Sequence, residues 1–284
     1  MGSARRASVP PCIIDQMDTV SFSEKFAAQE AEYRCLLPPT QIIGLRLDGK
    51  AFHTFTRQFA APFDLDFMAA MDDAARAVVG ELAGVLMAYI QSDEISIILS
   101  DRVSNAAELP FGGRVDKVLS IAAATASVGL YRSLTSRFGE TRGSPVFDAR
   151  IAFVGDLATA TDYLTWRRLD ARRNAVSMAV ECVLPKKQLA GLGLEQRVEA
   201  LKGTPHERLP DGFFFGRLLV WKTVERAGVN KLAGEAVTAT RRHLAVVPAT
   251  RQATDAAVGA VSERLAAGCD ARRTLVADRG ADYT

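Results

Sequence analysis

The sequence predicts an α+β fold in which helices pack on a mainly antiparallel sheet, and three patterns carry this prediction. Residues 41–47, QIIGLRL, form a β-rich run that ends at the turn dipeptide Asp48-Gly49. Apolar residues then recur at three- and four-residue spacing over 66–82, which indicates an amphipathic helix. Residues 85–90 and 95–99 are β-type runs around a four-residue polar turn, as in a hairpin. Because sequential strands tend to pair, the first strand and the hairpin should be neighbours.

The remaining patterns add long helices and further strands to this sheet. A small-residue-rich pattern over 116–138 predicts a second long helix, and FDARIAFV predicts a strand over 147–154. We expect the chain from Gly268 onward to be disordered. The other expected elements are helices at 158–183 and 195–201, a strand at 218–222, and a weakly helical tail at 254–267. The predicted division is an N-terminal extension with a lead-in helix (1–34), a catalytic domain (35–243) and a C-terminal helical extension (244–284).

Composition limits the classes of function. The chain has 284 residues, 48% of them hydrophobic, which is enough for one substantial core. The formal net charge is only +2, so a nucleic-acid surface would have to be a local patch. No apolar run reaches the roughly 18 residues of a membrane span, and the start does not resemble a secretory signal. We therefore expect a cytoplasmic protein that does not bind or cross a membrane. The widely spaced thiols favour a reducing compartment over a zinc knuckle or a disulfide framework: Cys12, Cys35, Cys182 and Cys269.

Two acidic turns are the candidate chemical centre. Asp48 follows the first strand, and Asp93 and Glu94 lie at the hairpin tip, so the predicted topology brings Asp48 opposite Asp93. Like charges at close range raise each other's energy, and a divalent cation removes that penalty. Magnesium commonly takes one or two carboxylates together with substrate phosphates. The Gly49 carbonyl is a candidate further ligand. The alternative is that both are ordinary solvated turns.

The residues after Asp48 form a candidate phosphate loop. Lys50-Ala51-Phe52-His53 has one cation and one imidazole, and its backbone amides can cradle a triphosphate. It is not a Walker loop. A turn with a solvated Lys50 and a partly packed His53 is the alternative. Glycoside hydrolysis, another use of paired carboxylates, has no support elsewhere in the chain.

Five segments resemble successive motifs of a known family. RLDGKAFHTF, APFDLDFM, YIQSDEIS, FDARI and DYLTWRRLDARRNA occur in order within residues 35–201. They resemble the motifs of the tRNA-histidine guanylyltransferase superfamily, and most closely those of its bacterial and archaeal members that act as general 3′ to 5′ polymerases. The combination of QSDE after a strand with an upstream R-x-DG-x-x-F carries most of this resemblance.

The resemblance implies a polymerase/cyclase-like palm with a two-magnesium site. Asp48, the Gly49 carbonyl and Asp93 match the metal ligands, and Glu94 matches an acidic residue important in the family. A nucleoside triphosphate would lie over the loop that follows the first strand. The positions that match nucleotide-binding residues are Arg46, Gly49, Lys50, Ala51, Phe52, His53, Ser92, Lys117 and Ser120.

The resemblance also implies the reaction and its partners. The family first activates a 5′-monophosphorylated tRNA with ATP or GTP and releases pyrophosphate. The 3′-hydroxyl of an incoming nucleotide then attacks the activated end. The closer match is to the general 3′ to 5′ polymerases, which favours repair of a truncated tRNA or tRNA-like RNA over dedicated guanylation of tRNA-histidine. Family members commonly form homotetramers, and the alanine-rich helix around 118–128 is a candidate for close helix contacts.

A cluster of four arginines on the third long helix begins at Arg167 and is a candidate RNA or activating-nucleotide contact. Arg168 and Arg172 are four residues apart, so they share a helix face and are expected to meet a phosphate together. A solvated helix face is the alternative. The resemblance favours contact with RNA or the activating nucleotide and adds the neighbouring Arg173 and Asn174.

Two departures from the family pattern concern the activation site. Arg172 replaces a histidine, and an arginine can contact phosphate but cannot act as a neutral imidazole. The segment after Thr204 is short, and Phe214 and Phe215 occupy places where relatives tend to carry cations. Lys202, Arg208 and Arg217 are candidate replacements. The alternatives to RNA extension are therefore a diverged palm enzyme acting on nucleotides without RNA, such as a cyclase or synthetase, and a noncatalytic RNA-binding protein.

Overall fold

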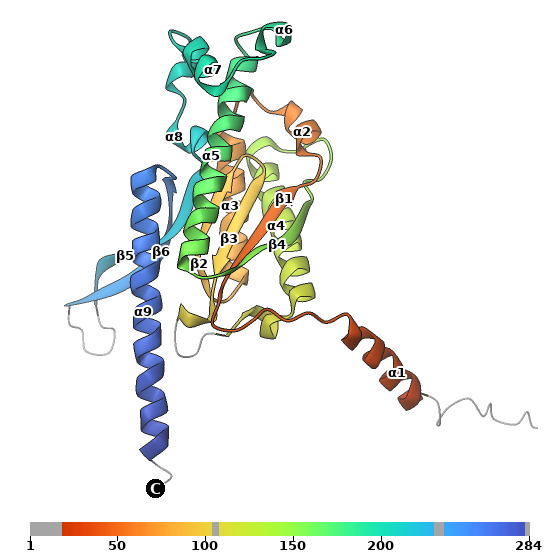
Figure 1. Ribbon diagram of the computed structural model, residues 1–284, viewed down its shortest axis with the longest axis vertical. Helices are drawn as coiled ribbons and strands as arrows, with labels where there is room; N and C mark the ends of the chain where they lie inside the picture. Colours follow the sequence, from red (N-terminus) through yellow and green to blue (C-terminus); the bar gives the residue numbers. More distant parts are fainter. Residues whose placement is uncertain (1–18, 104–107, 230–235, 282–284) are drawn as a thin grey trace, which may run out of the picture.

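Six antiparallel strands form one sheet in a computed structural model that describes residues 19–103, 108–229 and 236–281. The spatial order is β4-β1-β3-β2-β5-β6 (Figure 1). The first four strands and their two helices follow a β-α-β-β-α-β order, so β1 lies between β3 and β4. The strands are β1 (Ile42–Gly49), β2 (Val85–Gln91), β3 (Glu94–Leu99), β4 (Phe147–Gly155), β5 (Arg217–Val229) and β6 (Ala236–Pro248).

Long helices cover both faces of the sheet. One face packs against α3 and α4, and the other packs against α5 and α9 (Figure 1). The long helices are α3 (Leu65–Glu81), α4 (Val115–Phe138), α5 (Leu157–Glu181) and α9 (Arg251–Ala281). The shorter elements are α1 (Thr19–Glu32), α2 (Phe52–Phe55), α6 (Lys186–Leu189), α7 (Leu194–Leu201), α8 (Asp211–Phe214) and the 3-10 turns η1 (Thr56–Gln58), η2 (Asp101–Val103), η3 (Pro110–Gly113) and η4 (Pro205–Arg208).

Alternation along β1 separates the core from the site. Ile43, Leu45 and Leu47 are fully buried against α3 and α4. Arg46 and Asp48, at the alternate positions, are only partly buried on the face that α5 covers. Polar residues therefore gather under α5 at the end of the sheet where β1 finishes.

The predicted α+β class and its mainly antiparallel sheet are confirmed. The helix expected over 66–82 is α3, which begins after Asp64, whose carboxylate accepts hydrogen bonds from the N–H groups of Asp66 and Phe67. The expected hairpin is β2–β3, and β3 pairs with β1 as predicted. Among the described residues, no helix is long and apolar enough to cross a membrane.

Three expectations about the C-terminal third were wrong or incomplete. The strand expected at 218–222 is the inner part of the longer β5, and β6 was not predicted. β6 continues past His243 to Pro248, so the sheet crosses the predicted boundary between domain and tail. The chain after Gly268 was expected to be disordered, but α9 continues to Ala281. The outer half of β6 carries Arg241, Arg242 and His243, all exposed, which hides the apolar alternation of a strand.

Candidate active site

Backbone pairing joins the two acidic turns. Asp48 lies opposite Glu94 in the β1–β3 register, and the Gly49 N–H donates to the Asp93 carbonyl over 3.0 Å. The predicted meeting of the two turns is therefore observed at one edge of the sheet.

Unusual backbone conformations shape both turns. Ser92 has φ 44° and Ala51 has φ 57°, and both lie in the left-handed region that non-glycine residues seldom adopt. A Cβ atom at Gly49 would collide with the Phe52 ring. Glycine is thus required at the end of β1, because Phe52 is buried there against Phe55 and Phe147.

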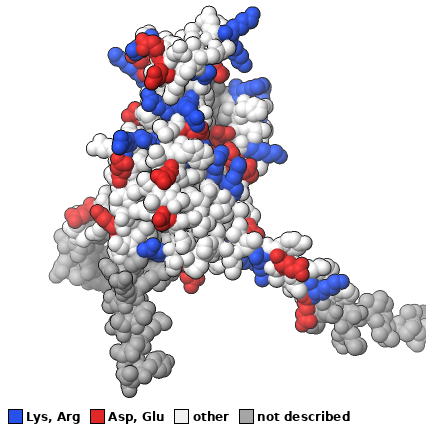
Figure 2. All heavy atoms as spheres, viewed as in Figure 1, with Lys and Arg blue, Asp and Glu red and all other residues white. Residues whose placement is uncertain are grey.

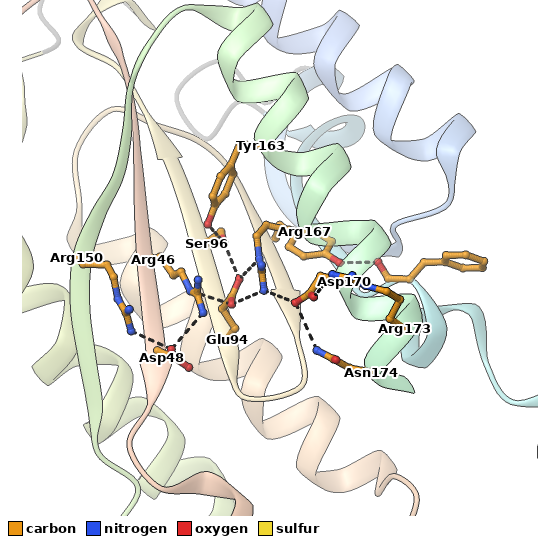
Figure 3. Close-up of polar contacts among 12 residues, drawn as sticks. Arg46, Asp48, Glu94, Ser96, Arg150, Tyr163, Arg167, Asp170, Arg173 and Asn174 are labelled. Carbon is orange, nitrogen blue, oxygen red and sulfur yellow. Dashed lines mark hydrogen bonds and ion pairs between the residues drawn. The ribbon is translucent and has the colours of Figure 1, made fainter. Parts of the chain in front are cut away.

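Two arginines compensate the charge of Asp48. The Asp48 Oδ2 atom lies 3.2 Å from Arg46 Nη2 and 2.9 Å from Arg150 Nη2. Figure 3 shows Arg150 directed at Asp48. Arg150 Nη2 also lies 3.0 Å from Asp148 Oδ1. The Asp48 carboxylate is therefore held between β1 and β4, and about a third of its side chain stays exposed.

Asp93 lacks such compensation. No cation lies within ion-pair distance of its carboxylate in the described ranges, although Arg46 is close enough to lower its pKa. Burial raises the pKa of Asp93, and the Asp48 charge raises it further, while hydrogen bonds with its own backbone and Ser92 oppose the rise. The ionised form of Asp93 is thus at a disadvantage unless a cation binds beside it.

Glu94 turns away from this pair into a buried ion-pair network (Figure 3). Arg167 donates from Nε and Nη2 to the two Glu94 carboxylate oxygens, each over 2.8 Å. Arg46 Nε lies 2.9 Å from Glu94 Oε2 on the other side. The Ser96 hydroxyl donates to Glu94 Oε1 over 3.4 Å and forms a 2.9 Å hydrogen bond with Tyr163 Oη. Glu94 therefore holds arginines in place and does not complete a third carboxylate ligand.

The face of α5 over the site continues this network. Asp170 accepts hydrogen bonds from Arg167 Nη2 (2.8 Å), Arg173 Nη2 (2.7 Å) and Asn174 Nδ2 (3.4 Å). Arg167 is buried, and its guanidinium also lies 4.4 Å from the Trp166 ring centre. Sequence reasoning counted Arg167 in the arginine cluster but missed its role, and it missed Asp170 entirely. The spacing Tyr163, Arg167, Asp170, Asn174 places all four on one helical face, which is the signal that points to them.

A pocket of about 640 Å³ opens between these groups and the C-terminal end of α5. This volume is in the usual range for a site that binds a small molecule. Its polar wall is formed by the strand ends and α5, and its apolar wall by 59–68 and Phe213. Acidic and basic side chains crowd the same end of the molecule in the surface view (Figure 2). The predicted site residues that line the pocket are Arg46, Asp48, Ser92, Asp93, Glu94 and Asn174.

The residues present fit a hard divalent cation. Asp48 and Asp93 supply two carboxylates at adjacent strand ends, and Asp93 is the one without a cation partner. No group of three or more His, Cys, Asp or Glu side chains able to hold a metal occurs in the part of the chain that the structure describes. Any further ligands would therefore be backbone oxygens, such as the Gly49 carbonyl, or substrate phosphates, as magnesium prefers.

The predicted phosphate loop borders the strand ends. Lys50 and His53 are exposed, and the His53 ring forms a 3.0 Å hydrogen bond with the Thr54 hydroxyl. The Lys50 N–H donates to the Val146 carbonyl, while the Ala51 carbonyl accepts from Thr54 and Phe55. The Phe52 side chain belongs to the core, so only its backbone is available to a ligand.

Two predicted nucleotide contacts lie elsewhere. Lys117 and Ser120 are exposed in the first turns of α4, at the opposite end of the sheet from the pocket, and neither lines it. The Ser120 hydroxyl donates to the Asp116 carbonyl over 2.7 Å. α4 runs antiparallel to β3, so its first turns cannot reach the tip of the β2–β3 hairpin within one chain.

The predicted pair of phosphate-binding arginines also lies outside the pocket. Arg168 and Arg172 do share a flank of α5, but that flank faces α8, where Arg172 lies 6.0 Å from the Phe215 ring centre. The Nε atom of Arg168 is buried without a hydrogen-bond partner in the described structure. Arg173 pairs with Asp170.

One candidate replacement cation reaches the pocket wall. Arg217 is buried, and its Nε lies 2.6 Å from Asp72 Oδ1. Its other nitrogens donate to the Met68 and Gly212 carbonyls. Lys202 instead pairs with Glu199 on an exposed helix end, and Arg208 is exposed away from the pocket. The three residues do not form one cationic cluster.

The fold and the paired strand-end carboxylates define a palm-type domain. A family profile for tRNAHis guanylyltransferase matches residues 24–155. The chain is 33% identical over 145 residues to a tRNA(His) guanylyltransferase of Debaryomyces hansenii, covering 49% of this chain and 52% of that protein. It is 30% identical over 188 residues to the Candida glabrata enzyme of that name, covering 63% and 76%.

A solved structure supports the same relationship. A bacterial tRNA(His) guanylyltransferase-like protein in complex with ATP superposes with a TM-score of 0.66 at 27% identity, covering 70% of this chain and 88% of that chain. The chain belongs to the tRNA(His) guanylyltransferase family. The matched region is only about half the length of the Debaryomyces relative.

Proposed function

We propose that this protein is a magnesium-dependent 3′ to 5′ nucleotidyltransferase that adds nucleotides to the 5′ end of tRNA or a tRNA-like RNA. The observation that carries this proposal is the Asp48–Asp93 pair at the edge of a pocket large enough for a nucleotide. The names of its relatives, which are tRNA(His) guanylyltransferases, supply the type of reaction.

The proposed metal ligands are Asp48, Asp93 and the Gly49 carbonyl, holding two magnesium ions. When bound, the ions neutralise phosphate charge and activate the attacking hydroxyl. The protein supplies position: Arg46 and Arg150 fix the Asp48 carboxylate, and the backbone hydrogen bond from Gly49 to Asp93 fixes the distance between the two turns. Glu94 is a positioning residue in this proposal, because its carboxylate is occupied by Arg46 and Arg167.

The proposed reaction has two transfers. In the first, a 5′-phosphate oxygen of the RNA bonds to the α-phosphorus of ATP or GTP, and pyrophosphate leaves. In the second, the 3′-hydroxyl oxygen of an incoming nucleotide bonds to the activated 5′ phosphorus, and the nucleoside monophosphate leaves. Both transfers mainly require charge neutralisation and in-line positioning. Backbone amides of residues 51–53 and Ser92 are the proposed contacts to the incoming triphosphate, because the Gly49 and Lys50 N–H groups already donate to the Asp93 and Val146 carbonyls.

Arg172 and Phe215 depart from the family pattern, and both departures concern the activation step of the proposed reaction. Arg172 is exposed and stacked near Phe215, so its guanidinium remains available for a phosphate outside the main pocket. We propose that Arg168, Arg172 and Arg173 contact the RNA backbone or the activating nucleotide from this flank of α5. The family resemblance further supports a homotetramer acting in the cytoplasm. We propose that its catalytic domain begins near residue 35 and continues past residue 243 to the end of β6 at Pro248.

The test is nucleotide addition to 5′-triphosphorylated tRNA transcripts that lack their first residue. A triphosphate end bypasses activation. We expect the wild type to extend this RNA with magnesium, Asp93→Asn to lose extension, and Asp162→Asn to retain it, because Asp162 is exposed on α5 and outside the pocket. Products formed from triphosphates without RNA would replace this proposal with RNA-independent nucleotide chemistry. Equal RNA binding with and without magnesium, and no pyrophosphate release, would indicate a noncatalytic binding protein.

A further inference from the structure

Gln91 is a buried polar residue to which the proposed reaction gives no role. It ends β2 and lies opposite Glu94 in the β2–β3 register, so the two residues close the hairpin around its tip. Residues directly opposite each other share a face of the sheet, so the Gln91 side chain lies on the face where Glu94 meets Arg167 of α5 (Figure 3). Gln91 is only 5% exposed, and it lines the pocket.

The Gln91 Oε1 atom is buried without a hydrogen-bond partner among the described residues. Buried side-chain acceptors are nearly always paired, because losing a hydrogen bond with water without replacing it costs free energy. Arg46 Nε and Arg168 Nε share this condition. Arg46 Nε, however, lies 2.9 Å from a Glu94 carboxylate oxygen, and Arg168 does not line the pocket. Within the described ranges, Gln91 Oε1 is thus the pocket-lining atom that lacks any partner.

The buried polar groups around Gln91 are already paired with one another. The hydroxyl of Tyr89, two residues earlier on the same strand and face, donates to the Phe215 carbonyl over 2.8 Å. The pairs nearby are Glu94 with Arg167, Ser96 with Tyr163, and Arg217 with Asp72. None of these groups is free to donate to Gln91, so its acceptor is available to a ligand in the pocket.

The place of Gln91 along the sheet edge limits which part of a ligand it meets. The strand order β1-β3-β2-β5 puts Gln91 between Asp48 on one side and Arg217 on the other. The backbones at Asp48 and Gln91 are roughly 10 Å apart, which is two strand spacings. Arg217 adjoins the apolar wall of the pocket, because it donates to the Met68 and Gly212 carbonyls. Gln91 therefore lies where the charged side of the pocket meets its apolar side.

A nucleoside triphosphate that spans this boundary presents its nucleoside to Gln91. In the proposed function the phosphates lie near Asp48 and Asp93. The base fits against the apolar wall, where the Phe63 and Phe213 ring centres are 5.0 Å apart. The ribose and the adjoining edge of the base then pass over Gln91. Phosphate oxygens only accept hydrogen bonds at neutral pH, whereas ribose hydroxyls and base amino groups donate them.

We infer that Gln91 recognises the nucleoside part of the bound triphosphate, with its Oε1 atom accepting a hydrogen bond from a ribose hydroxyl or a base amino group. The inference rests on the proposed function for the identity of the ligand. It assigns Gln91 a different task from that of Asp48 and Asp93, because Gln91 selects the nucleoside and does not compensate phosphate charge.

The first test separates a ligand contact from a structural one. Gln91→Met keeps a side chain of similar length and removes the acceptor. Because that acceptor is unpaired in the protein alone, the variant should unfold at the same urea concentration as the wild type or a higher one. It should bind magnesium–GTP about five- to tenfold more weakly by calorimetry. Binding of magnesium–tripolyphosphate, which has no nucleoside, should not change.

Gln188→Met is the matched control for this test. Gln188 is exposed on α6 and does not line the pocket, so the control should match the wild type in unfolding and in both binding measurements.

The second test identifies the donor. Binding of GTP, 2′-deoxy-GTP, 3′-deoxy-GTP and inosine triphosphate, which lacks the base amino group, is compared between the wild type and Gln91→Met. The analogue that lacks the partner group should bind equally well to both proteins. The other nucleotides should keep the loss of about five- to tenfold.

Unchanged GTP binding by Gln91→Met would overturn the inference, as would a loss shared by tripolyphosphate or by all the nucleotides. Easier unfolding of Gln91→Met would also overturn it, since the amide would then be paired inside the protein. Nucleotide addition to RNA is measured separately. A wild type that binds GTP through Gln91 but extends no RNA would refute the proposed function alone, and a wild type that binds no GTP would refute both.

Discussion

Replacing Arg167 with methionine is the perturbation whose magnitude the structure defines best. The Arg167 and Glu94 side chains are each 5% exposed, and the pair shares two 2.8 Å hydrogen bonds. Removing one partner of a buried pair leaves an uncompensated charge and costs about 3–5 kcal/mol. Arg46 remains 2.9 Å from Glu94, so we expect the lower end, about 3 kcal/mol.

The loss should depend on pH in a defined direction. Burial raises the pKa of Glu94, and the charges of Arg167 and Arg46 oppose that rise. Without Arg167 the folded-state pKa rises further above the unfolded value. A carboxyl group with a raised folded-state pKa stabilises the fold below its unfolded pKa and loses that contribution as pH rises through the folded pKa. The deficit of Arg167→Met should therefore be larger at neutral pH than near pH 5.

The assay is urea unfolding followed by circular dichroism at several pH values. Arg173→Met is the control, because Arg173 pairs with Asp170 but is 60% exposed and should cost no more than about 1 kcal/mol. Adding Glu94→Gln to Arg167→Met should recover part of the loss, since it removes the unpaired charge. The reasoning is refuted if Arg167→Met costs no more than Arg173→Met, or if its deficit is the same at every pH.

Two further predictions concern the turn and the pocket wall. Gly49→Ala places a methyl group against the buried Phe52 ring and should lower the free energy of unfolding by about 1–3 kcal/mol. Gly80→Ala is the control, because its methyl group would have nothing within 4 Å, and it should be neutral or stabilise the fold by up to about 1 kcal/mol. Equal effects of the two variants in urea unfolding would contradict the packing argument. Burial and the Glu181 charge raise the pKa of the Cys182 thiol, which lies in the pocket wall. The rate of its alkylation by iodoacetamide should therefore keep rising with pH above the usual thiol pKa, and it should fall when nucleotide binds. A rate that levels off at the usual thiol pKa, or no protection by nucleotide, would contradict this placement.

Local periodicity was sufficient to predict the strand ends that carry Asp48 and Asp93. The stripe of α3 reflects burial on one face, and the nearly continuous apolar runs of β1 and β3 reflect burial on both faces of the sheet. A single sequence records both patterns directly. β6 was missed because its outer half is exposed and cationic, so its pairing with β5 is determined by tertiary contact and not by local pattern.

The arginines of α5 show which part of the site could not be predicted from the sequence. Four arginines lie within seven residues of α5, and spacing alone does not say which of them faces the sheet. Arg167 is buried because Glu94 lies opposite it, a long-range pairing that depends on how α5 crosses β3. Lys117 and Ser120 were assigned by family resemblance to a site that their own chain places at the other end of α4.

The most direct test of the central claim is manganese binding, measured by electron paramagnetic resonance with a non-hydrolysable GTP analogue present. Manganese serves as a magnesium substitute with a detectable free signal. We expect the wild type and Asp162→Asn, a change at an exposed position on α5 outside the pocket, to bind two ions per chain together with the nucleotide, and Asp48→Asn and Asp93→Asn each to weaken this binding at least tenfold. Unchanged binding in both of the latter variants, with folding intact, would show that the metal lies elsewhere and would contradict the account.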